Sequence, residues 1–190
     1  MKRSVLIFAI VFAWAAAAFS QVQVGSKVES FSLRDTEGKT QSLADLRGQS
    51  GIVLIFVSIE CPVVRGYNER MNELAKAYRS KGINVVGVDS NVTESAADVK
   101  AHTMTTWDFP VVLDLDSKLA DRLGANVTPE AFYVDANNIL QYHGAIDNDR
   151  SGRNVTERFL KTAFDASLSG KKPERTTANA FGCSIKRAGQ

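Results

Sequence analysis

Two continuous apolar runs dominate the hydrophobic pattern of this chain. Residues 51–58 (GIVLIFVS) and 83–88 (INVVGV) are rich in β-branched side chains and contain no charged residue. Such runs are typical of strands buried on both faces of a sheet, because a strand with one face in water alternates apolar and polar residues. We therefore predict two central strands here and a third, shorter strand at residues 109–113.

Helical spacing, with apolar residues three or four positions apart, begins directly after the first of these strands. It starts at Cys61-Pro62 and ends near residues 81–82, and Pro62 suits the first turn, where a missing N–H costs nothing. The apolar face of this helix comprises Val64, Tyr67, Met71, Leu74, Ala75 and Tyr78. Shorter helices are predicted at residues 93–103, 117–123 and 156–168.

Two polar turns join pairs of strand-like segments. Residues 22–33 and 40–43 flank one turn, and residues 131–134 and 139–143 flank the other, which predicts two antiparallel hairpins. Strands and helices otherwise alternate along the chain. This order predicts the α/β fold class, with a central mixed sheet flanked by helices and a hairpin near the N-terminus.

The first 20 residues differ from everything that follows. Lys2 and Arg3 precede an unbroken apolar run from Val5 to Phe19, and small residues end the segment at Ser20. This is the pattern of a secretory signal peptide, and the run is shorter than the roughly 20 residues of a membrane-spanning helix. We predict cleavage near Ser20, a periplasmic or secreted mature protein, and no stable membrane insertion; a retained membrane anchor is the alternative.

Composition limits the rest of the chain to one domain without a strong electrostatic footprint. The chain has 190 residues, of which 44% are hydrophobic, and a formal net charge of +2. Both excess positive charges belong to residues 1–20, so the mature chain is neutral, with a basic tail at residues 171–190. We predict a domain at residues 21–170 followed by this tail, no nucleic-acid partner, and a solvated charged loop at residues 147–153.

Two cysteines and two histidines restrict the chemistry further. They exclude a four-cysteine zinc site and a disulfide-rich scaffold, and His102 and His143 stand too far apart in the sequence to suggest paired ligands. We therefore predict no metal and no cofactor. Any thiol chemistry runs through Cys61 and Cys183.

Cys61 lies between the strand predicted at residues 51–58 and the helix behind it. Free N–H groups and the dipole at a helix N-terminus stabilise a thiolate, so we expect an accessible thiol with a lowered pKa. Arg65, one turn along the helix, adds to this effect, whereas the adjacent Glu60 opposes it. The alternative is a buried cysteine with a purely structural role.

Three motifs occur together in this chain: Cys61-Pro62 between a strand and a helix, Val127-Thr128-Pro129-Glu130 ahead of a strand, and a hairpin that ends in His143-Gly144. With them, about residues 24–169 resemble the thioredoxin-like superfamily, and more narrowly its redoxin branch, which includes the alkyl hydroperoxide reductase and thiol-specific antioxidant proteins. The resemblance implies a thioredoxin-like fold with a cis Thr128–Pro129 bond. That bond turns the Thr128 backbone toward the thiol, where an extended partner docks. A trans proline at the start of a strand is the alternative.

The chain departs from these families at the reactive cysteine. Disulfide reductases of this superfamily carry C-x-x-C, whereas Cys61 is followed by Pro-Val-Val, and Arg65 replaces the second cysteine of the copper-delivery motif C-x-x-x-C. The peroxiredoxin motif P-x-x-x-[ST]-x-x-C is half present, since Ser58 and Cys61 match but Leu54 replaces the proline. Ser58 is a candidate donor to the Cys61 sulfur or to a peroxide oxygen; a serine that merely ends a strand is the alternative.

Cys183 is the other thiol of the chain. It lies in a small apolar island at residues 180–185 of the polar tail, which suggests a docking segment rather than a disordered end. A C-terminal resolving cysteine is similar to that of two-cysteine peroxiredoxins, where it comes from the partner subunit of a homodimer. The alternatives are a static Cys61–Cys183 bridge and an unpaired Cys183.

These features favour an exported thioredoxin-like thiol oxidoreductase that acts on a thiol or disulfide protein partner. Cys61 is the predicted attacking thiolate and Cys183 the resolving thiol, with Ser58, Pro62, Arg65, Thr128 and Pro129 in support. One alternative is a peroxiredoxin-type peroxidase that reduces hydroperoxides through a Cys61 sulfenic acid. Another is a redox-inactive binding or scaffold domain with a static disulfide.

Overall fold

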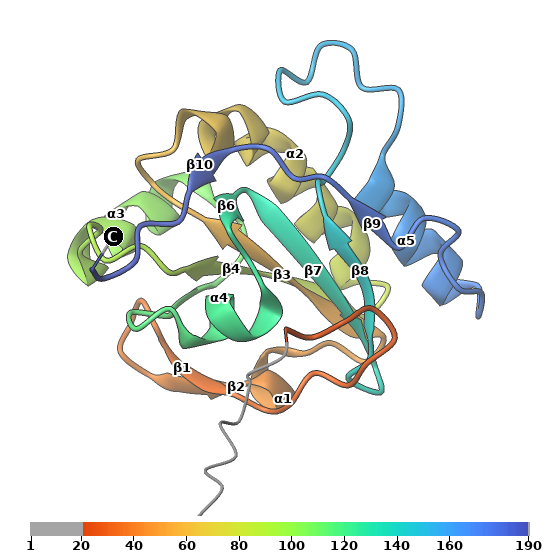
Figure 1. The fold of residues 1–190 in the computed structure, drawn as a ribbon, viewed down its shortest axis with the longest axis horizontal. Helices are drawn as coiled ribbons and strands as arrows, with labels where there is room; N and C mark the ends of the chain where they lie inside the picture. Colours follow the sequence, from red (N-terminus) through yellow and green to blue (C-terminus); the bar gives the residue numbers. More distant parts are fainter. Residues whose placement is uncertain (1–20, 190) are drawn as a thin grey trace, which may run out of the picture.

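The computed structural model of this protein describes residues 21–189 (Figure 1). The predicted signal peptide at residues 1–20 lies outside the described residues. The centre of the molecule is an eight-stranded mixed sheet with the strand order β2-β1-β5-β4-β3-β7-β8-β9. Its strands are β1 (Ser32–Asp35), β2 (Thr40–Ser42), β3 (Gly51–Val57), β4 (Ile83–Asp89), β5 (Val111–Leu113), β7 (Glu130–Asp135), β8 (Leu140–Gly144) and β9 (Thr177–Ala178). The α/β class, the central mixed sheet and both hairpins are confirmed.

Strand β3 is the centre of this sheet. All seven of its residues are buried, and it pairs with β4 in parallel and with β7 in antiparallel orientation. Side chains of a strand point alternately to the two faces of the sheet. Val53, Ile55 and Val57 therefore enter one hydrophobic cluster, and Ile52 and Leu54 enter the other. Both faces of the sheet are covered at β3, which explains why its sequence is continuously apolar and does not alternate with polar residues.

Helices cover both faces of the sheet. The first cluster is closed by the long helix α2 (Pro62–Arg79) together with α3 (Ala96–Thr106) and α5 (Phe159–Leu168). The second cluster is closed by the short helices α1 (Leu43–Leu46) and α4 (Lys118–Leu123). Among residues 21–189, none of the helices combines the length and the apolar character of a membrane span.

Two predicted helix starts and one predicted strand are displaced. Helix α3 begins at Ala96, because Ser95, rather than Thr93, caps it by accepting the Asp98 N–H (3.2 Å). Two residues ahead of this helix, Asn91 and Glu94, instead make hydrogen bonds near Cys61 and Cys183 that are described with the active site. Helix α5 begins at Phe159, since Thr156 bonds to the Asn148 side chain instead of starting a helix. The strand predicted at residues 22–33 starts only at Ser32.

The C-terminal tail is part of the fold. Strand β9 pairs with β8 in parallel at the edge of the main sheet, and β10 (Cys183–Ser184) pairs with β6 (Val127–Thr128) in antiparallel orientation. In Figure 1 the tail leaves α5, passes β9 and β10 across the ends of the central strands, and finishes near α3. We call residues 177–187 of this tail the strap. The predicted docking segment is confirmed, and the disordered alternative is wrong for the strap.

Candidate active site

Cys61 occupies the position where the central strand gives way to the long helix. It is the N-cap residue of α2, directly ahead of Pro62 at the first helical position. The free N–H groups of this helix end and its dipole favour negative charge on the sulfur. The side chain is only 1% exposed, however, so the expectation of an accessible thiol is wrong for this state of the molecule.

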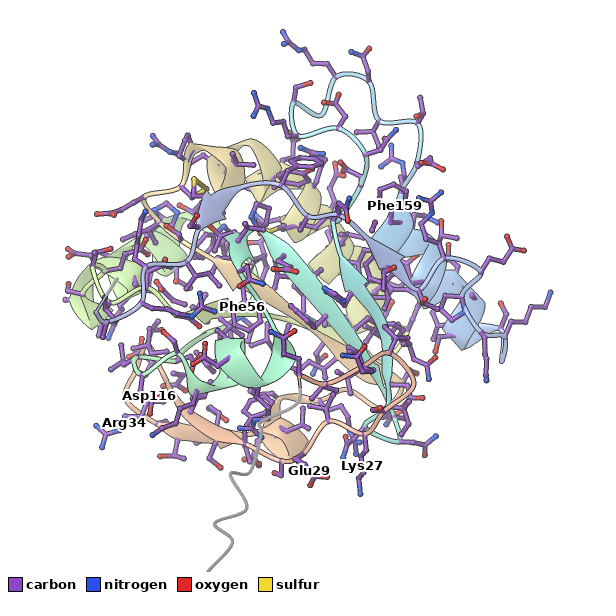
Figure 2. The ribbon with its side chains drawn as sticks, in the orientation of Figure 1. Lys27, Glu29, Arg34, Phe56, Asp116 and Phe159 are labelled. Carbon is purple, nitrogen blue, oxygen red and sulfur yellow. A yellow bond between two sulfur atoms is a disulfide. The ribbon has the colours of Figure 1, made fainter. Side chains whose placement is uncertain are left out.

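A disulfide joins Cys61 to Cys183 within one chain (Figure 2). The two Cα atoms are 5.9 Å apart, although 122 positions separate the residues in the sequence. Cys183 lies in β10 and is half-buried, whereas Cys61 is almost completely covered. The two residues of the bridge therefore differ in their exposure, and Cys183 is the less buried one.

The Thr128–Pro129 peptide bond is cis and lies beside the disulfide, so this prediction is confirmed. The Thr128 carbonyl oxygen is 3.3 Å from the Cys61 sulfur. Thr128 is also the residue that faces Cys183 in the β6–β10 pair, and its hydroxyl donates to the Cys183 carbonyl oxygen (3.5 Å). The backbone edge that the resemblance assigns to an extended partner is thus occupied by the protein's own strap.

Beyond the disulfide, the strap is held at three consecutive residues. The Ile185 N–H donates to the Asn126 carbonyl oxygen (3.0 Å), and the Ile185 side chain is 1% exposed within the second hydrophobic cluster. The Lys186 N–H donates to Asn91 Oδ1 (3.0 Å). Arg187 donates to the Asp121 carboxylate (2.9 Å) and to a backbone carbonyl of the loop after α4 (2.6 Å). Both backbone and side-chain contacts therefore hold the strap against the rest of the molecule.

A buried glutamate, which no sequence pattern indicated, organises the loop before Cys61. Glu94 is 7% exposed and accepts hydrogen bonds from the Ser58 hydroxyl, from the Ile59 N–H (2.9 Å) and from the Glu60 N–H (3.4 Å). The Ser58 hydroxyl is therefore directed at Glu94, and it makes no hydrogen bond to the Cys61 sulfur among the described residues. Glu94 fixes the course of the chain immediately ahead of the cysteine.

Asp89, at the end of β4, extends this polar group toward the strap. Burial and the neighbouring Glu94 carboxyl raise the pKa of Asp89, so that it keeps its proton where an ordinary aspartate would be ionised. Asp89 Oδ1 accepts from the backbone and side-chain N–H groups of Asn91 (2.8 and 3.0 Å). Asn91 in turn accepts from Lys186 of the strap. One polar cluster thus contacts both segments that carry a cysteine.

The Arg65 side chain makes no hydrogen bond or ion pair within the described residues 21–189. Arg65 is exposed on the outer side of α2, and it lies close enough to His102 to contribute to the lowered pKa of that imidazole, whose main cause is burial. Pro62, Thr128 and Pro129 are at the site, whereas Ser58 is one step removed from it. The helix N-terminus and the Thr128 carbonyl are the polar groups that the structure places next to Cys61.

The charged loop at residues 147–153 is only partly solvated, which corrects the prediction. Asp147 is 3% exposed, accepts from the Tyr67 hydroxyl (3.0 Å) and forms an ion pair with Arg70. The Tyr67 ring also lies near Phe181 of the strap, with 6.5 Å between ring centroids. The rule that charged loops are solvated fails here because Asp147 has a half-buried cationic partner and a buried hydroxyl partner on α2.

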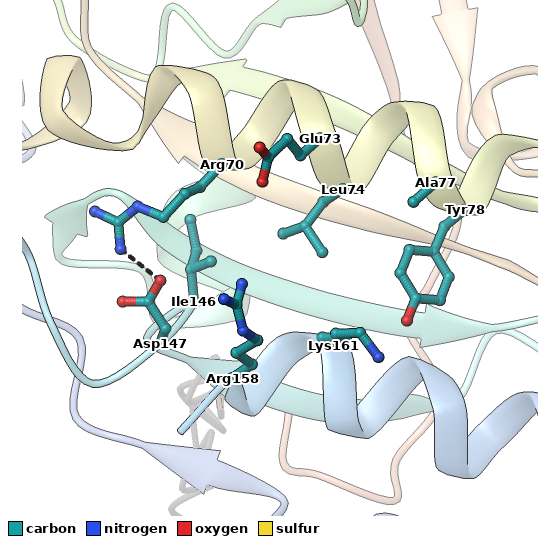
Figure 3. A pocket seen from close by; sticks show the side chains of 9 residues that line it. All are labelled: Arg70, Glu73, Leu74, Ala77, Tyr78, Ile146, Asp147, Arg158 and Lys161. Carbon is teal, nitrogen blue, oxygen red and sulfur yellow. Dashed lines mark hydrogen bonds and ion pairs between the residues drawn. The ribbon is translucent and has the colours of Figure 1, made fainter. Parts of the chain in front are cut away.

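A cavity of about 150 Å³ opens between α2 and α5 beside this ion pair (Figure 3). Its polar lining includes Arg70, Asp147, Arg158 and Lys161. Neither cysteine lines it. The thiol site is therefore separate from this cavity and consists of the covered surface under the strap.

Comparisons with known proteins place this chain in one family and give several relatives. The profile of the AhpC/TSA family matches residues 24–143. A thiol-disulfide oxidoreductase ResA from Bacillus cereus is 31% identical over 117 residues, which cover 60% of this chain and 65% of that protein. A thiol:disulfide interchange protein DsbE from Yersinia pestis is 33% identical over 130 residues and 67% of each chain. The chain thus spans slightly less than two thirds of the Bacillus relative.

Solved structures match over more of the chain. A hypothetical protein from Sinorhizobium meliloti is 30% identical with a TM-score of 0.81, and the match covers 90% of this chain and 98% of that one. An uncharacterized conserved protein from Geobacillus kaustophilus is 26% identical with a TM-score of 0.83, over 90% and 95% of the two chains. A peroxidoxin BcpB from Mycobacterium tuberculosis, 18% identical with a TM-score of 0.54 over 79% and 94% of the two chains, shares the fold.

Proposed function

This chain belongs to the AhpC/TSA family and has the thioredoxin-like fold, and we propose that it is an exported thiol-disulfide oxidoreductase whose working disulfide joins Cys61 and Cys183. The observation that carries the proposal is this disulfide, placed at the N-terminus of α2 and against the Thr128 carbonyl. The names of the Bacillus and Yersinia relatives support the reaction class. The pattern of residues 1–20 supports export to an oxidising compartment.

Reduction of the enzyme begins at Cys183. A donor thiolate attacks the Cys183 sulfur, because Cys183 is the less buried residue of the pair and Cys61 is covered. The Cys61–Cys183 bond breaks, a donor–Cys183 disulfide forms, and Cys61 leaves as a thiolate stabilised by the helix end. A second donor thiolate then attacks the donor sulfur of this mixed disulfide and releases Cys183. Two donor thiols are oxidised to one disulfide, and the enzyme gains two thiols.

The second half of the cycle passes these electrons to a partner. The Cys61 thiolate attacks one sulfur of the partner disulfide, and the other partner sulfur leaves as a thiolate. The Cys183 thiolate then attacks Cys61 in this mixed disulfide, which reforms the internal bridge and releases the second partner thiol. A buried Cys61 requires the strap to move aside during this half. Thr128 contributes the carbonyl that accepts the S–H of Cys61 when this thiol is protonated.

A turnover assay tests the proposal. The mature protein is given a small thiol donor and a protein disulfide substrate, and disulfide reduction is compared among wild type, Cys61→Ser and Cys183→Ser. Ser184→Ala is the matched control, since Ser184 is the exposed neighbour of Cys183 in the same strand. We expect both cysteine variants to lose catalytic turnover and the control to retain it.

The same samples separate the alternatives. Hydrogen peroxide consumption that depends on Cys61, without reduction of the protein disulfide, would identify a peroxidase instead. If Cys61 resists alkylation after mild reduction and neither reaction occurs, the bridge is static and the oxidoreductase proposal fails.

A further inference from the structure

The strap is bound in the way that an added strand binds to a free sheet edge. Strand β10 pairs with β6 in a fixed register, Cys183 opposite Thr128 and Ser184 opposite Val127. In this mode backbone hydrogen bonds supply affinity, and pockets for alternate side chains supply specificity. The residues around Cys183 therefore show what this edge accepts.

Three positions of the strap are restricted by their surroundings. A Cβ atom on Gly182 would lie 1.9 Å from the Thr128 carbonyl oxygen, so the position before the cysteine accepts only glycine. Two positions after the cysteine, Ile185 fills a pocket of the second hydrophobic cluster and is 1% exposed. Four positions after it, Arg187 pairs with Asp121. Ser184 and Lys186 are exposed, so the positions between are unrestricted.

We propose that, in the reduced enzyme, this edge binds an extended segment of a partner protein with the pattern Gly-Cys-x-aliphatic-x-basic, seated in the register of the strap. The inference rests on the proposed function, and it names the class of substrate that the site selects. The cysteine of the segment is one half of the partner disulfide and takes the place of Cys183 next to Cys61. The Cys61 thiolate attacks its sulfur, and the other half of that disulfide leaves as a thiolate.

The strap and the partner segment compete for one surface. The strap is tethered, which gives it a high effective concentration, but β10 has only two residues and the disulfide is its covalent link to the site. Reduction removes that link. The Asn126 carbonyl and Asn91 side chain, which bind the strap backbone, then become available to the backbone of another chain.

The test uses the mature protein with Cys183→Ser, so that Cys61 is its only cysteine. The probe is a peptide with the sequence of residues 179–188 (NAFGCSIKRA), whose cysteine is activated as a mixed disulfide with thionitrobenzoate. Release of thionitrobenzoate gives the rate, and intact mass confirms the Cys61–peptide disulfide. Two matched peptides carry Asp at the isoleucine position and Ala at the glycine position. The glutathione–thionitrobenzoate disulfide is the small reference compound.

We expect the parent peptide to react about tenfold or more faster than either substituted peptide, because each loses apolar burial or clashes with the Thr128 carbonyl. Adding Ile185→Ala to the protein weakens the strap and leaves the groove intact, so it should raise the rate with the parent peptide. Equal rates for the three peptides, or a slower reaction after this second substitution, would overturn the inference while the proposed function stands.

Two further results are decisive. If the glutathione compound and all peptides leave Cys61 unmodified even with Ile185→Ala present, the proposed function itself fails. If oxidised wild-type protein forms covalent dimers on a non-reducing gel, the strap of a second copy is the occupant of the edge, and the partner-segment inference is wrong.

Discussion

The two segments that meet in the disulfide differ in how they are held. Cys61 follows a strand with all seven residues buried and caps a helix of 18 residues, and Glu94 fixes the loop in front of it. Cys183 lies in a strand of two residues, and the residues directly before and after this cysteine, Gly182 and Ser184, are exposed. One cysteine thus belongs to the core and the other to a short strand of the strap. The disulfide holds both segments in place in the oxidised protein. The substitutions below should show how firmly each segment is held by its other contacts.

The largest effect should come from breaking the bridge. A disulfide that links residues 122 positions apart stabilises the folded state by about 5 kcal/mol in the chain-entropy model. Reduction, or Cys183→Ser, should therefore lower the free energy of unfolding by an amount of that order, measured by urea denaturation. Ser184→Ala is the control. An unchanged unfolding midpoint would mean that the strap is held as firmly without the bond.

Truncation of one isoleucine on each side should separate local from global opening. Ile55 in β3 and Ile185 in the strap are both completely or almost completely buried, and each substitution by alanine should cost about 2 to 5 kcal/mol. In the reduced protein, Ile55→Ala should weaken hydrogen-exchange protection everywhere, whereas Ile185→Ala should weaken it mainly at the strap. Equal loss of protection in β3 for both variants would contradict the distinction between core and strap.

Glu94→Gln should loosen the Cys61 side of the bridge. A glutamine has one acceptor oxygen in place of two, so at least one donor among Ser58, Ile59 and Glu60 loses its partner, at a cost of about 1 to 3 kcal/mol. The thiol of reduced Cys61 should then be alkylated faster. Glu73→Gln, at an exposed position of α2, is the matched control. Identical alkylation rates in the two variants would show that Glu94 does not restrict access to Cys61.

The buried Asp89 predicts a pH dependence of stability. Its pKa is raised in the folded state, so its contribution is fully present below the ordinary aspartate pKa and is lost as pH rises toward the folded value. Asp89→Asn keeps the acceptor for Asn91 and cannot ionise. The free energy of unfolding of the variant, measured by urea denaturation, should rise relative to wild type between pH 4 and pH 8, by about 1.4 kcal/mol for each unit of the pKa shift. A constant difference across this range would contradict the assignment.

The smallest effect should come from the ion pair at the end of the strap. Arg187 donates to Asp121, whose side chain is 62% exposed, and pairs of this kind contribute about 0 to 1 kcal/mol. Arg187→Ala should therefore change the unfolding midpoint little in the oxidised protein. A loss as large as that of Ile185→Ala would show that charge, rather than apolar burial, seats the strap.

Sequence patterns were sufficient where the cause of a structure is local. Adjacent residues were enough to predict strand β3 and the helix that begins at Pro62. The cis Thr128–Pro129 bond followed from the resemblance to the thioredoxin-like superfamily. Glu94 and Asp147 were not predictable in this way, since their partners Ser58 and Arg70 are distant in sequence and adjacent only in the folded molecule.

The position of the strap was likewise only partly predictable from the sequence. Its apolar island indicated docking, but the register against β6 depends on the Thr128 backbone, on Asn126 and on the pocket for Ile185. None of these carries a signal that points to the tail. The pairing of the two cysteines was therefore one of the alternatives that the sequence offered, whereas their unequal exposure required the structure.

A redox titration of the Cys61–Cys183 pair tests the central claim most directly. The mature protein is equilibrated in dithiol buffers of stepped potential, free thiols are alkylated, and intact mass gives the oxidised fraction. A working disulfide should titrate reversibly with a midpoint above about −300 mV, in the range of thiol-disulfide oxidoreductases. A pair that stays oxidised well below about −300 mV would be a static structural bridge, and the oxidoreductase account would be contradicted.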